Sequence, residues 1–440
     1  MRLNVFIAFN NMIKRSKFFH YFLLGMILII FIGFLTSFNK EEKYVDRTDQ
    51  KINELISSWV QFYLTLESQD YDAFPPTSSD QLFKINLAAY VAQKIASDQY
   101  ALDCEEVYEL LDYVYATQIK NTFKNHPQIL QKVILRQGQK DSNKSDIILE
   151  ISTLSSEIVE SYNNKSSKIP FANSKGNHDI LEFDQKNGIL PNWGTRNTCV
   201  ASLNSCKVDQ PYFGMDRLSG IHKDAMTVYS ISKGLSKEDQ WIAEFWSDDL
   251  RGLTYSPVSR WFSIGIQMIQ KENLTYTESL KLLALLAIGL HDATIICWHE
   301  KYKHNVGRPE NYIQTYIDTD WKPFHETPSF PSYPSGHAVL SSAAGQILES
   351  YFGKTYSFTD RSHNHRTEFY GSARSFNTIR EMAIENAYSR ILMGVHFPED
   401  CEAGLKLGIQ VGDIIIKNGE KSITSKIEAK MNNGHCSLKT

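Results

Sequence analysis

The residues best suited to chemistry in this chain lie around Pro334-Ser335-Gly336-His337. Apolar residues recur at helical spacing from Ala338 to about Tyr351, so the preceding triplet stands where a helix begins. A helix N-terminus presents unpaired N–H groups and partial positive charge, and Gly336 lets the backbone approach a ligand closely. The stretch is therefore a candidate oxyanion site. In isolation, a proline-rich turn with a serine N-cap and a surface histidine explains it better.

Two basic residues stand near the end of an upstream helical pattern. The pattern runs from Thr277, the expected N-cap, to about Lys303, and Lys301 lies in its last turns. Arg308 follows, just past a glycine that ends the helix. Taken alone, Lys301 and Arg308 read as the ordinary solvated basic end of a helix, where they complement the macrodipole.

A third group of residues lies further along the chain. Residues 381–393 form a helical pattern that contains Arg390, and His396 stands in the break before Pro398 opens the next helix. Asp400 comes four residues after His396, so it can accept a hydrogen bond from one ring nitrogen and raise the basicity of the other. As a lone pair, these two residues would more often make a structural hydrogen bond.

Together the three groups resemble a known superfamily signature. They match the pattern shared by type 2 phosphatidic acid phosphatases (PAP2), bacterial acid phosphatases and vanadium-dependent haloperoxidases, in the segments Lys301-x6-Arg308-Pro309, Pro334-Ser335-Gly336-His337 and Ser389-Arg390-x5-His396-x3-Asp400. The bacterial vanadium-dependent haloperoxidase-like members are most similar, through Trp298, Phe330-Pro331-Ser332-Tyr333 and the segment 243–248. The likeness covers about residues 70–417 and is tight over 290–400. Ser259-Arg260-Trp261 departs from the Gly-His-Trp of relatives, a difference that bears on substrate access or halide binding.

The resemblance implies roles for individual residues. His337, His396 and Asp400 are expected to be catalytic, and the anion is expected to be bound by Lys301, Arg308, Ser335, Gly336 and Arg390. With vanadate as cofactor, His396 is the vanadium ligand, and hydrogen peroxide oxidises a halide, iodide or bromide being favoured. With a phosphate ester as substrate and no cofactor, His396 is instead the nucleophile, forming a phospho-histidine, and His337 is the acid and base.

The haloperoxidase interpretation is preferred over an acid phosphatase because the chain is long and carries additional N-terminal helices. An inactive anion-binding scaffold is a third alternative, but it predicts the loss of a signature residue and none is lost. Trp298 and Phe330 are candidate pocket walls, with core packing as an equally good explanation. His291 and Asp292 are either partners of the site residues or, more simply, a satisfied buried pair.

Composition narrows the remaining choices. The 440 residues include 46 basic and 50 acidic ones, which disfavours a nucleic-acid partner, whereas small-molecule substrates fit. The six cysteines form no Cys-x-x-Cys pair, which argues against a structural zinc site. Cys199 and Cys206 could form a disulfide or remain two thiols. The oligomeric state stays open.

The first 38 residues suggest a membrane segment. A basic N-terminus, residues 1–17, precedes an apolar run over 18–38 that is long enough to span a bilayer. The basic flank predicts a cytoplasmic N-terminus and an extracytoplasmic catalytic region, at the cell surface or in the periplasm. Secretion after cleavage of a signal segment is the alternative.

The remaining sequence predicts an all-α fold. Helical periodicity dominates, with an N-terminal helical region over 45–230, a catalytic helical domain over 231–417 and a C-terminal tail over 418–440. The family resemblance implies paired four-helix bundles, with the anion site in the C-terminal one. Residues 358–376 are expected to form a surface loop, with a flap over the pocket as the alternative.

Overall fold

The computed structural model describes residues 47–70, 73–137, 146–162, 182–184, 188–211, 215–248, 250, 252–367 and 373–433, which belong to one compact unit. The expected membrane segment, residues 18–38, lies outside them. The described chain is mainly helical, as predicted. The helices before residue 250 are α2 (Arg47–Glu67), α3 (Pro75–Gln99), α4 (Cys104–Thr122), α5 (Pro127–Gln137), α6 (Asp146–Glu160), the 3-10 turn η2 (Trp193–Thr195), α7 (Met215–Ser232) and α8 (Lys237–Phe245). The later elements are α9 (Pro257–Glu272), α10 (Tyr276–His304), α11 (Pro309–Tyr316), α12 (Gly336–Phe352), β1 (Phe358–Asp360), β2 (Arg374–Phe376), α13 (Ile379–Leu392) and α14 (Pro398–Asn433).

Helix α10 lies at the centre of the packing. It contacts α3, α12 and α14, and nearly every residue from Ser279 to Tyr302 is buried. Its N-cap is Thr275, which forms a capping box with Glu278, so the expected N-cap at Thr277 was wrong by two residues. Among the described helices, α10 alone is long and apolar enough to cross a membrane. Its hydrophobicity is accounted for by burial in the core.

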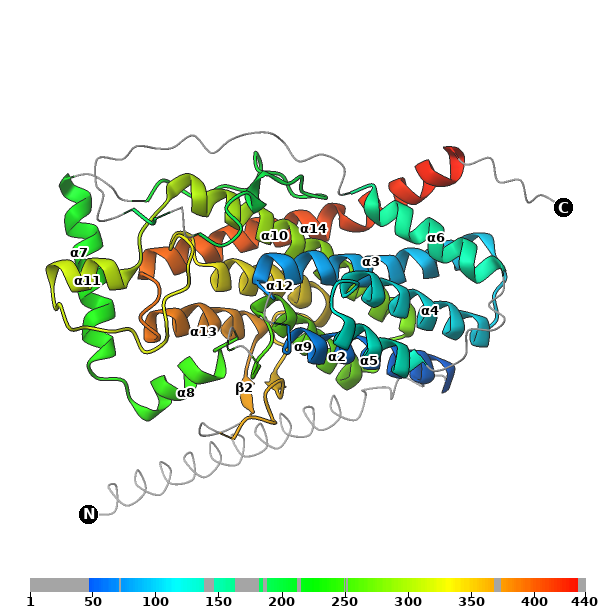
Figure 1. The fold of residues 1–440 in the computed structure, drawn as a ribbon, viewed down its shortest axis with the longest axis horizontal. Helices are drawn as coiled ribbons and strands as arrows, with labels where there is room; N and C mark the ends of the chain where they lie inside the picture. Colours follow the sequence, from blue (N-terminus) through cyan, green and yellow to red (C-terminus); the bar gives the residue numbers. More distant parts are fainter. Residues whose placement is uncertain are drawn as a thin grey trace, which may run out of the picture. The chain divides into compact units, whose positions relative to one another are not determined.

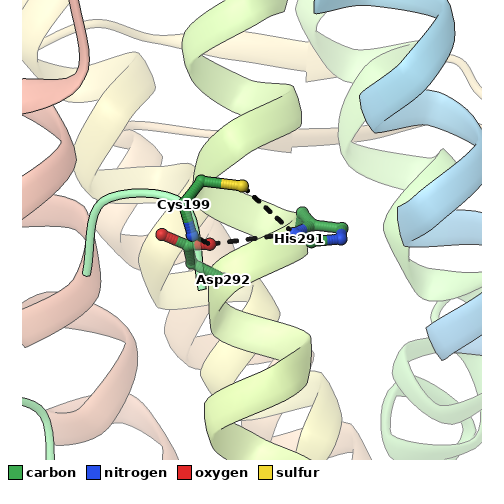
Figure 2. A group of neighbouring side chains, drawn as sticks. All are labelled: Cys199, His291 and Asp292. Atoms are coloured by element: carbon green, nitrogen blue, oxygen red, sulfur yellow. Dashed lines mark hydrogen bonds and ion pairs between the residues drawn. The ribbon is translucent and has the colours of Figure 1, made fainter. Parts of the chain in front are cut away.

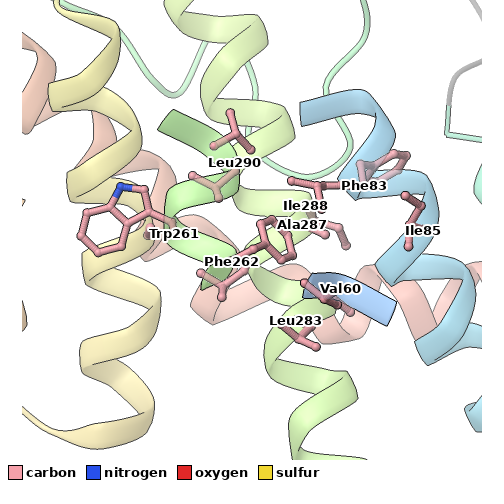
Figure 3. Packing of buried hydrophobic residues seen from close by; sticks show 14 of the residues in the cluster. Val60, Phe83, Ile85, Trp261, Phe262, Leu283, Ala287, Ile288 and Leu290 are labelled. Carbon is pink, nitrogen blue, oxygen red and sulfur yellow. The ribbon is translucent and has the colours of Figure 1, made fainter. Parts of the chain in front are cut away.

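One apolar core joins the early and late helices. Figure 3 shows Val60 of α2 and Phe83 of α3 packed with Phe262 of α9 and Leu283 of α10. Because α10 contributes buried residues around its whole circumference, it packs against helices on both sides of the expected boundary at 230. The N-terminal helices thus complete the hydrophobic core of the later ones.

The C-terminal tail expected from residue 418 begins inside a helix. Helix α14 continues to Asn433, and Ile423 and Ile427 are buried along it. Its first half packs closely on α12 through glycines. A Cβ at Gly408 would lie 2.2 Å from the carbonyl oxygen of Val339 and 2.0 Å from Ser342 Oγ, so only glycine permits this approach.

The described parts of the segment 358–376, residues 358–367 and 373–376, are more ordered than the expected surface loop. The two ends, β1 and β2, form an antiparallel hairpin with Phe358 opposite Phe376. Asp360 and His363 are fully buried because Asp360 pairs with the buried Arg260 of α9. The prediction of a plain surface loop was therefore wrong for these residues. The buried ion pair between Arg260 and Asp360 holds them in the protein interior, and such a pair cannot be recognised from sequence periodicity.

The α12–α14 contact gives a first prediction. Gly408→Ala should destabilise the protein by about 1–3 kcal/mol, since the added methyl group meets backbone atoms that cannot yield without separating the helices. Gly234→Ala is the matched control, because nothing lies within 4 Å of its Cβ position. Urea unfolding of both variants measures the difference. Equal stabilities would contradict the tight helix contact.

Candidate anion site

The expected site residues come together where five helices end or begin. Lys301 lies in the last turn of α10 and Arg390 in the last turn of α13. Arg308 and Ser335 are the N-caps of α11 and α12, and Asp400 lies in the first turn of α14. Three helix N-termini therefore contribute to one region, which favours negative charge there.

His396 is held by a network on both ring nitrogens. Its Nδ1 lies 2.9 Å from Asp400 Oδ2, and its Nε2 lies 3.0 Å from Nη1 of Arg308. The carboxylate can only accept and the guanidinium can only donate. His396 therefore carries its proton on Nδ1 and presents a lone pair on Nε2. Ser332 donates to the same Asp400 oxygen at 2.5 Å, and so does the Phe397 N–H at 2.9 Å.

His337 and Arg390 form a second contact. Nη1 of Arg390 lies 3.3 Å from His337 Nε2, and its Nε donates to Ser389 Oγ at 3.0 Å. The other guanidinium nitrogen donates to the carbonyl oxygen of Trp246, at the end of α8. The guanidinium is thus oriented from two sides before any ligand binds.

Lys301 and Arg308 lie behind these groups. Lys301 Nζ donates to the carbonyl oxygens of Pro331 and Ser332 at 2.8 and 2.9 Å. Arg308 donates through Nε to Phe330 O at 3.0 Å and through Nη1 to Val395 O at 2.7 Å. Both side chains are buried, so their charges act on the site at low dielectric.

A small cavity opens at the centre of this arrangement. It has a volume of about 30 Å³, room for one or two water-sized molecules. Gly336, His337, Arg390 and His396 line it together with the expected wall residues Trp298 and Phe330, whose rings pack 5.2 Å apart. A Cβ at Gly336 would meet Lys301 and Trp298 only at 3.8 and 3.9 Å, so this glycine keeps room for a ligand and is not required by crowding.

Ser335 supplies an unused hydroxyl at the same place. A serine at an N-cap normally accepts a hydrogen bond from the helix backbone, but Ser335 makes no such bond. Its Oγ is buried and has no hydrogen-bond partner of normal geometry among the described residues. A buried hydroxyl without a partner costs free energy, which a bound oxyanion would recover.

Burial is the main cause of the pKa shifts at the site, and the neighbouring positive charges add to it for the two histidines. Burial, reinforced by the charges of Arg390, Lys301 and Arg308, holds the pKa of His337 well below its usual range. The pKa of His396 is lowered in the same way by burial and by Arg308. Burial also lowers the pKa of Lys301 and raises that of Asp400. A bound anion would oppose the shifts of the three cationic groups.

Two contributors were not singled out from the sequence. Ser332 belongs to a segment noted only for its resemblance, and the Trp246 carbonyl is a backbone group with no sequence signal. Arg260, at the position that departs from the family pattern, does not line the cavity. It is fully buried between Asp248, at 3.2 Å, and Asp360, at 2.9 Å.

His291 and Asp292 serve a different part of the fold. Figure 2 shows them on α10 beside Cys199. Both carboxylate oxygens of Asp292 accept backbone N–H groups, from residues 199, 200 and 201, at 2.6–2.8 Å. His291 stacks on Phe83, and its pKa is raised by Asp292 and Asp80 although burial lowers it. The pair therefore clamps this loop to α10, and these contacts account for Asp292 without a metal ion. Cys199 and Cys206 are both free thiols.

Comparisons with known proteins relate the helices that carry the site to one family. A family model described as the VCPO second helical-bundle domain matches residues 281–425, which contain the residues of the candidate site. The chain is also 25% identical over 175 residues to vanadium chloroperoxidase of Curvularia inaequalis, a match that covers 28% of each protein. The chain thus aligns with only about a quarter of that relative's length.

Solved structures extend the likeness to most of the fold. The first bacterial vanadium-dependent iodoperoxidase is similar with a TM-score of 0.70 and 23% identity, over 83% of this chain and 96% of that one. The apo and holo forms of a bacterial vanadium-dependent chloroperoxidase give TM-scores of 0.63 at 14% and 13% identity, over 82% of this chain and 97% and 96% of theirs. Together, the signature residues, the helical-bundle domain matched over residues 281–425 and the shared fold make the chain similar to vanadium haloperoxidases.

Proposed function

We propose that the protein is a vanadate-dependent haloperoxidase that oxidises a halide, iodide or bromide, with hydrogen peroxide. The observation that carries the proposal is the cavity itself. Arg390, His337 and His396 line it, and Lys301 and Arg308 are buried beside its wall residue Phe330. When bound, vanadate supplies the centre that activates hydrogen peroxide for two-electron oxidation of the halide.

The residues present fit that cofactor. Arg390, Lys301 and Arg308 would balance the charge of a tetrahedral oxyanion, and guanidinium groups suit its oxygen edges. Ser335 Oγ and the Gly336 N–H would donate to it, while His396 Nε2 would be the ligand atom. Asp400 holds the proton on His396 Nδ1, which leaves the lone pair on Nε2; Arg308 Nη1 donates to that lone pair and would have to release it for Nε2 to bind the anion.

His337 is the proposed acid–base group. Its depressed pKa leaves it neutral near neutral pH, able to accept a proton from a bound molecule and return it. Arg390 beside its Nε2 favours the neutral form, and a bound anion would bring the pKa back towards the working range. Trp298 and Phe330 exclude bulk water from this proton transfer.

We also propose that residues 18–38 anchor the protein in a membrane and that the catalytic region lies outside the cytoplasm. The support is the apolar run with its basic N-terminal flank. Free hydrogen peroxide and halide are small enough to reach an enzyme placed there. A phospho-histidine phosphatase remains the alternative for the same site.

Halide oxidation can be tested directly. The full chain loaded with orthovanadate should oxidise iodide with hydrogen peroxide, and His396→Ala should lose at least 99% of that activity because the ligand atom is removed. His126→Ala, in the turn before α5, is the control. Triiodide absorbance measures the rate. Hydrolysis of p-nitrophenyl phosphate without vanadate, in the absence of any halide oxidation, would replace the proposal with the phosphatase alternative.

Because the Ser335 hydroxyl has no hydrogen-bond partner of normal geometry in the part of the chain that the structure describes, its removal should weaken orthovanadate binding without lowering the stability of the protein. Ser335→Ala should weaken orthovanadate binding roughly ten- to a hundredfold, the value of a hydrogen bond to a charged group, with no loss of thermal stability. Ser341→Ala is the matched control, since that hydroxyl already donates to the carbonyl oxygens of Ala338 and Ala383. It should lower stability and leave binding unchanged. Titration calorimetry and thermal unfolding measure the two effects, and unaltered vanadate affinity in Ser335→Ala would count against the hydroxyl as a ligand donor.

The two buried histidines predict a pH-dependent stability. Their folded pKa values lie below the unfolded value of about 6.5, so below that pH the unfolded chain binds more protons and the vanadate-free protein loses stability. Asp400 opposes this because its folded pKa is raised. Between pH 6.5 and 5, His337→Gln should reduce the decrease in the free energy of unfolding by up to about 1.4 kcal/mol per pH unit. Exposed His365→Gln is the control, and identical pH profiles for wild type and His337→Gln would refute the buried neutral histidine.

A further inference from the structure

A second, larger cavity lies directly beside the anion cavity. Its volume is about 430 Å³, and Pro75, Pro328 and Phe330 line both spaces. We call this larger space the outer cavity. The two cavities therefore have part of their walls in common.

The outer cavity has the opposite electrostatic character to the anion cavity. The described residues that line it include four carboxylates and no lysine, arginine or histidine; the carboxylates are Glu67, Asp70, Asp248 and Glu326. Apolar surface from Phe74, Ile189 and Tyr255 lies among them. Negative charge with aromatic walls suits an organic cation and disfavours an organic anion.

Asp248 gives this cavity a specific recognition group. Its Oδ1 accepts from Arg260 at 3.2 Å and lies 3.3 Å from His363 Nε2. Its Oδ2 is fully buried and has no hydrogen-bond partner among the described residues. A buried carboxylate oxygen without a donor is costly, so a ligand that brings an N–H group would be stabilised there.

Glu67 does not share this property. Ser256 donates to its two oxygens through its N–H at 3.2 Å and its hydroxyl at 2.9 Å. Burial raises the pKa of Glu67, and the hydrogen bonds from serine residues act against that rise. Asp248 thus differs from Glu67, because its Oδ2 is buried at the wall of the outer cavity and has no donor among the described residues.

A small anion need not cross the outer cavity. A third cavity of about 200 Å³ shares Pro328, Arg390 and Val395 with the anion cavity, and both His325 and Glu326 also line it. Halide can approach along the Arg390 side, where a guanidinium attracts it. The acidic outer cavity is then free for another molecule.

We propose that the outer cavity binds an organic amine with an aromatic or alkyl body and holds it as the acceptor of the oxidised halogen. The proposal rests on the haloperoxidase function. For a phenolic amine and iodide the reaction is ArH + I⁻ + H₂O₂ + H⁺ → ArI + 2 H₂O. Peroxide is reduced by two electrons, iodide is oxidised, the C–I bond replaces a ring C–H bond, and the ring proton leaves to solvent.

Two phenols of opposite charge test the proposal. Tyramine carries an ammonium group and 4-hydroxyphenylacetate a carboxylate on the same ring, so their ratio of iodination rates cancels general changes in activity. For the vanadate-loaded full chain, the kcat/KM for tyramine divided by that for 4-hydroxyphenylacetate should be at least tenfold higher than the same ratio of iodination rates given by iodine in free solution. A ratio equal to that of free iodine would overturn the proposal, since halogenation would then occur outside the cavity.

Asp248→Asn removes the charge while its amide oxygen can keep the contacts to Arg260 and His363, and it should reduce the tyramine preference about tenfold. Ser329→Arg adds positive charge at an exposed position of the outer cavity and should do the same, whereas Ser329→Gln, its neutral control, should not. Glu109→Gln, exposed on α4, controls for loss of a surface carboxylate. If Asp248→Asn does not fold, the Ser329 pair decides the outcome, and an unchanged ratio in Ser329→Arg counts against the proposal.

A binding measurement separates this proposal from the haloperoxidase function. Tyramine should bind the vanadate-free protein in calorimetry, and 4-hydroxyphenylacetate should not. If the protein oxidises iodide but neither prefers tyramine over 4-hydroxyphenylacetate nor binds tyramine, the outer-cavity proposal is refuted and the haloperoxidase function is not. Absence of iodide oxidation would refute the underlying function, and tyramine binding that is lost in Asp248→Asn would still establish the cation site.

Discussion

The arrangement of positive charge around one small cavity is the constraint on which the rest of the structure depends. Lys301, Arg308 and Arg390 are buried within one region, and two histidines there are kept neutral by burial and by these charges. Removing such groups from water is costly, and mutual repulsion adds to the cost. Backbone carbonyl groups offset part of it, as Pro331, Ser332, Phe330 and Val395 do for Lys301 and Arg308. The remaining imbalance is what a multiply charged oxyanion would neutralise.

The fold supplies the rigidity that this charge cluster requires. Helix α10 is buried along its length and carries Lys301 at its end, while α12 and α14 are held together by glycine contacts that fix Ser335 relative to Asp400. The Ser335 N–H donates to the Asp400 carbonyl at 2.9 Å, which joins two helix N-termini directly. The N-terminal helices contribute by completing the core around α10. Their role is structural at the anion site, although Pro75 of α3 lines both the anion cavity and the outer cavity.

The two cavities divide the chemistry by charge. The anion cavity and the approach beside Arg390 favour small anions, whereas the outer cavity carries carboxylates and aromatic surface. Arg260, where the sequence departs from its relatives, contributes to this second space, because it holds Asp248 by one oxygen and leaves the other without a donor. The departure from the family pattern at Arg260, expected to bear on substrate access or halide binding, thus lies beside the outer cavity through its pairing with Asp248.

The sequence by itself determined the helical class and the set of polar residues that gather around the anion cavity. Helical periodicity and spacing are local properties, so α10, α12 and the break containing His396 could be placed before the structure was known. Tertiary structure decided the rest: the Trp246 carbonyl that orients Arg390, the Ser332 hydroxyl on Asp400, the burial of Asp360 and His363, and the continuation of α14 beyond residue 418. These depend on contacts between residues 60 to 150 positions apart or on backbone groups that every residue carries. Such contacts form only when packing brings the segments together, and for that reason the acidic outer cavity could not be predicted from spacing along the chain.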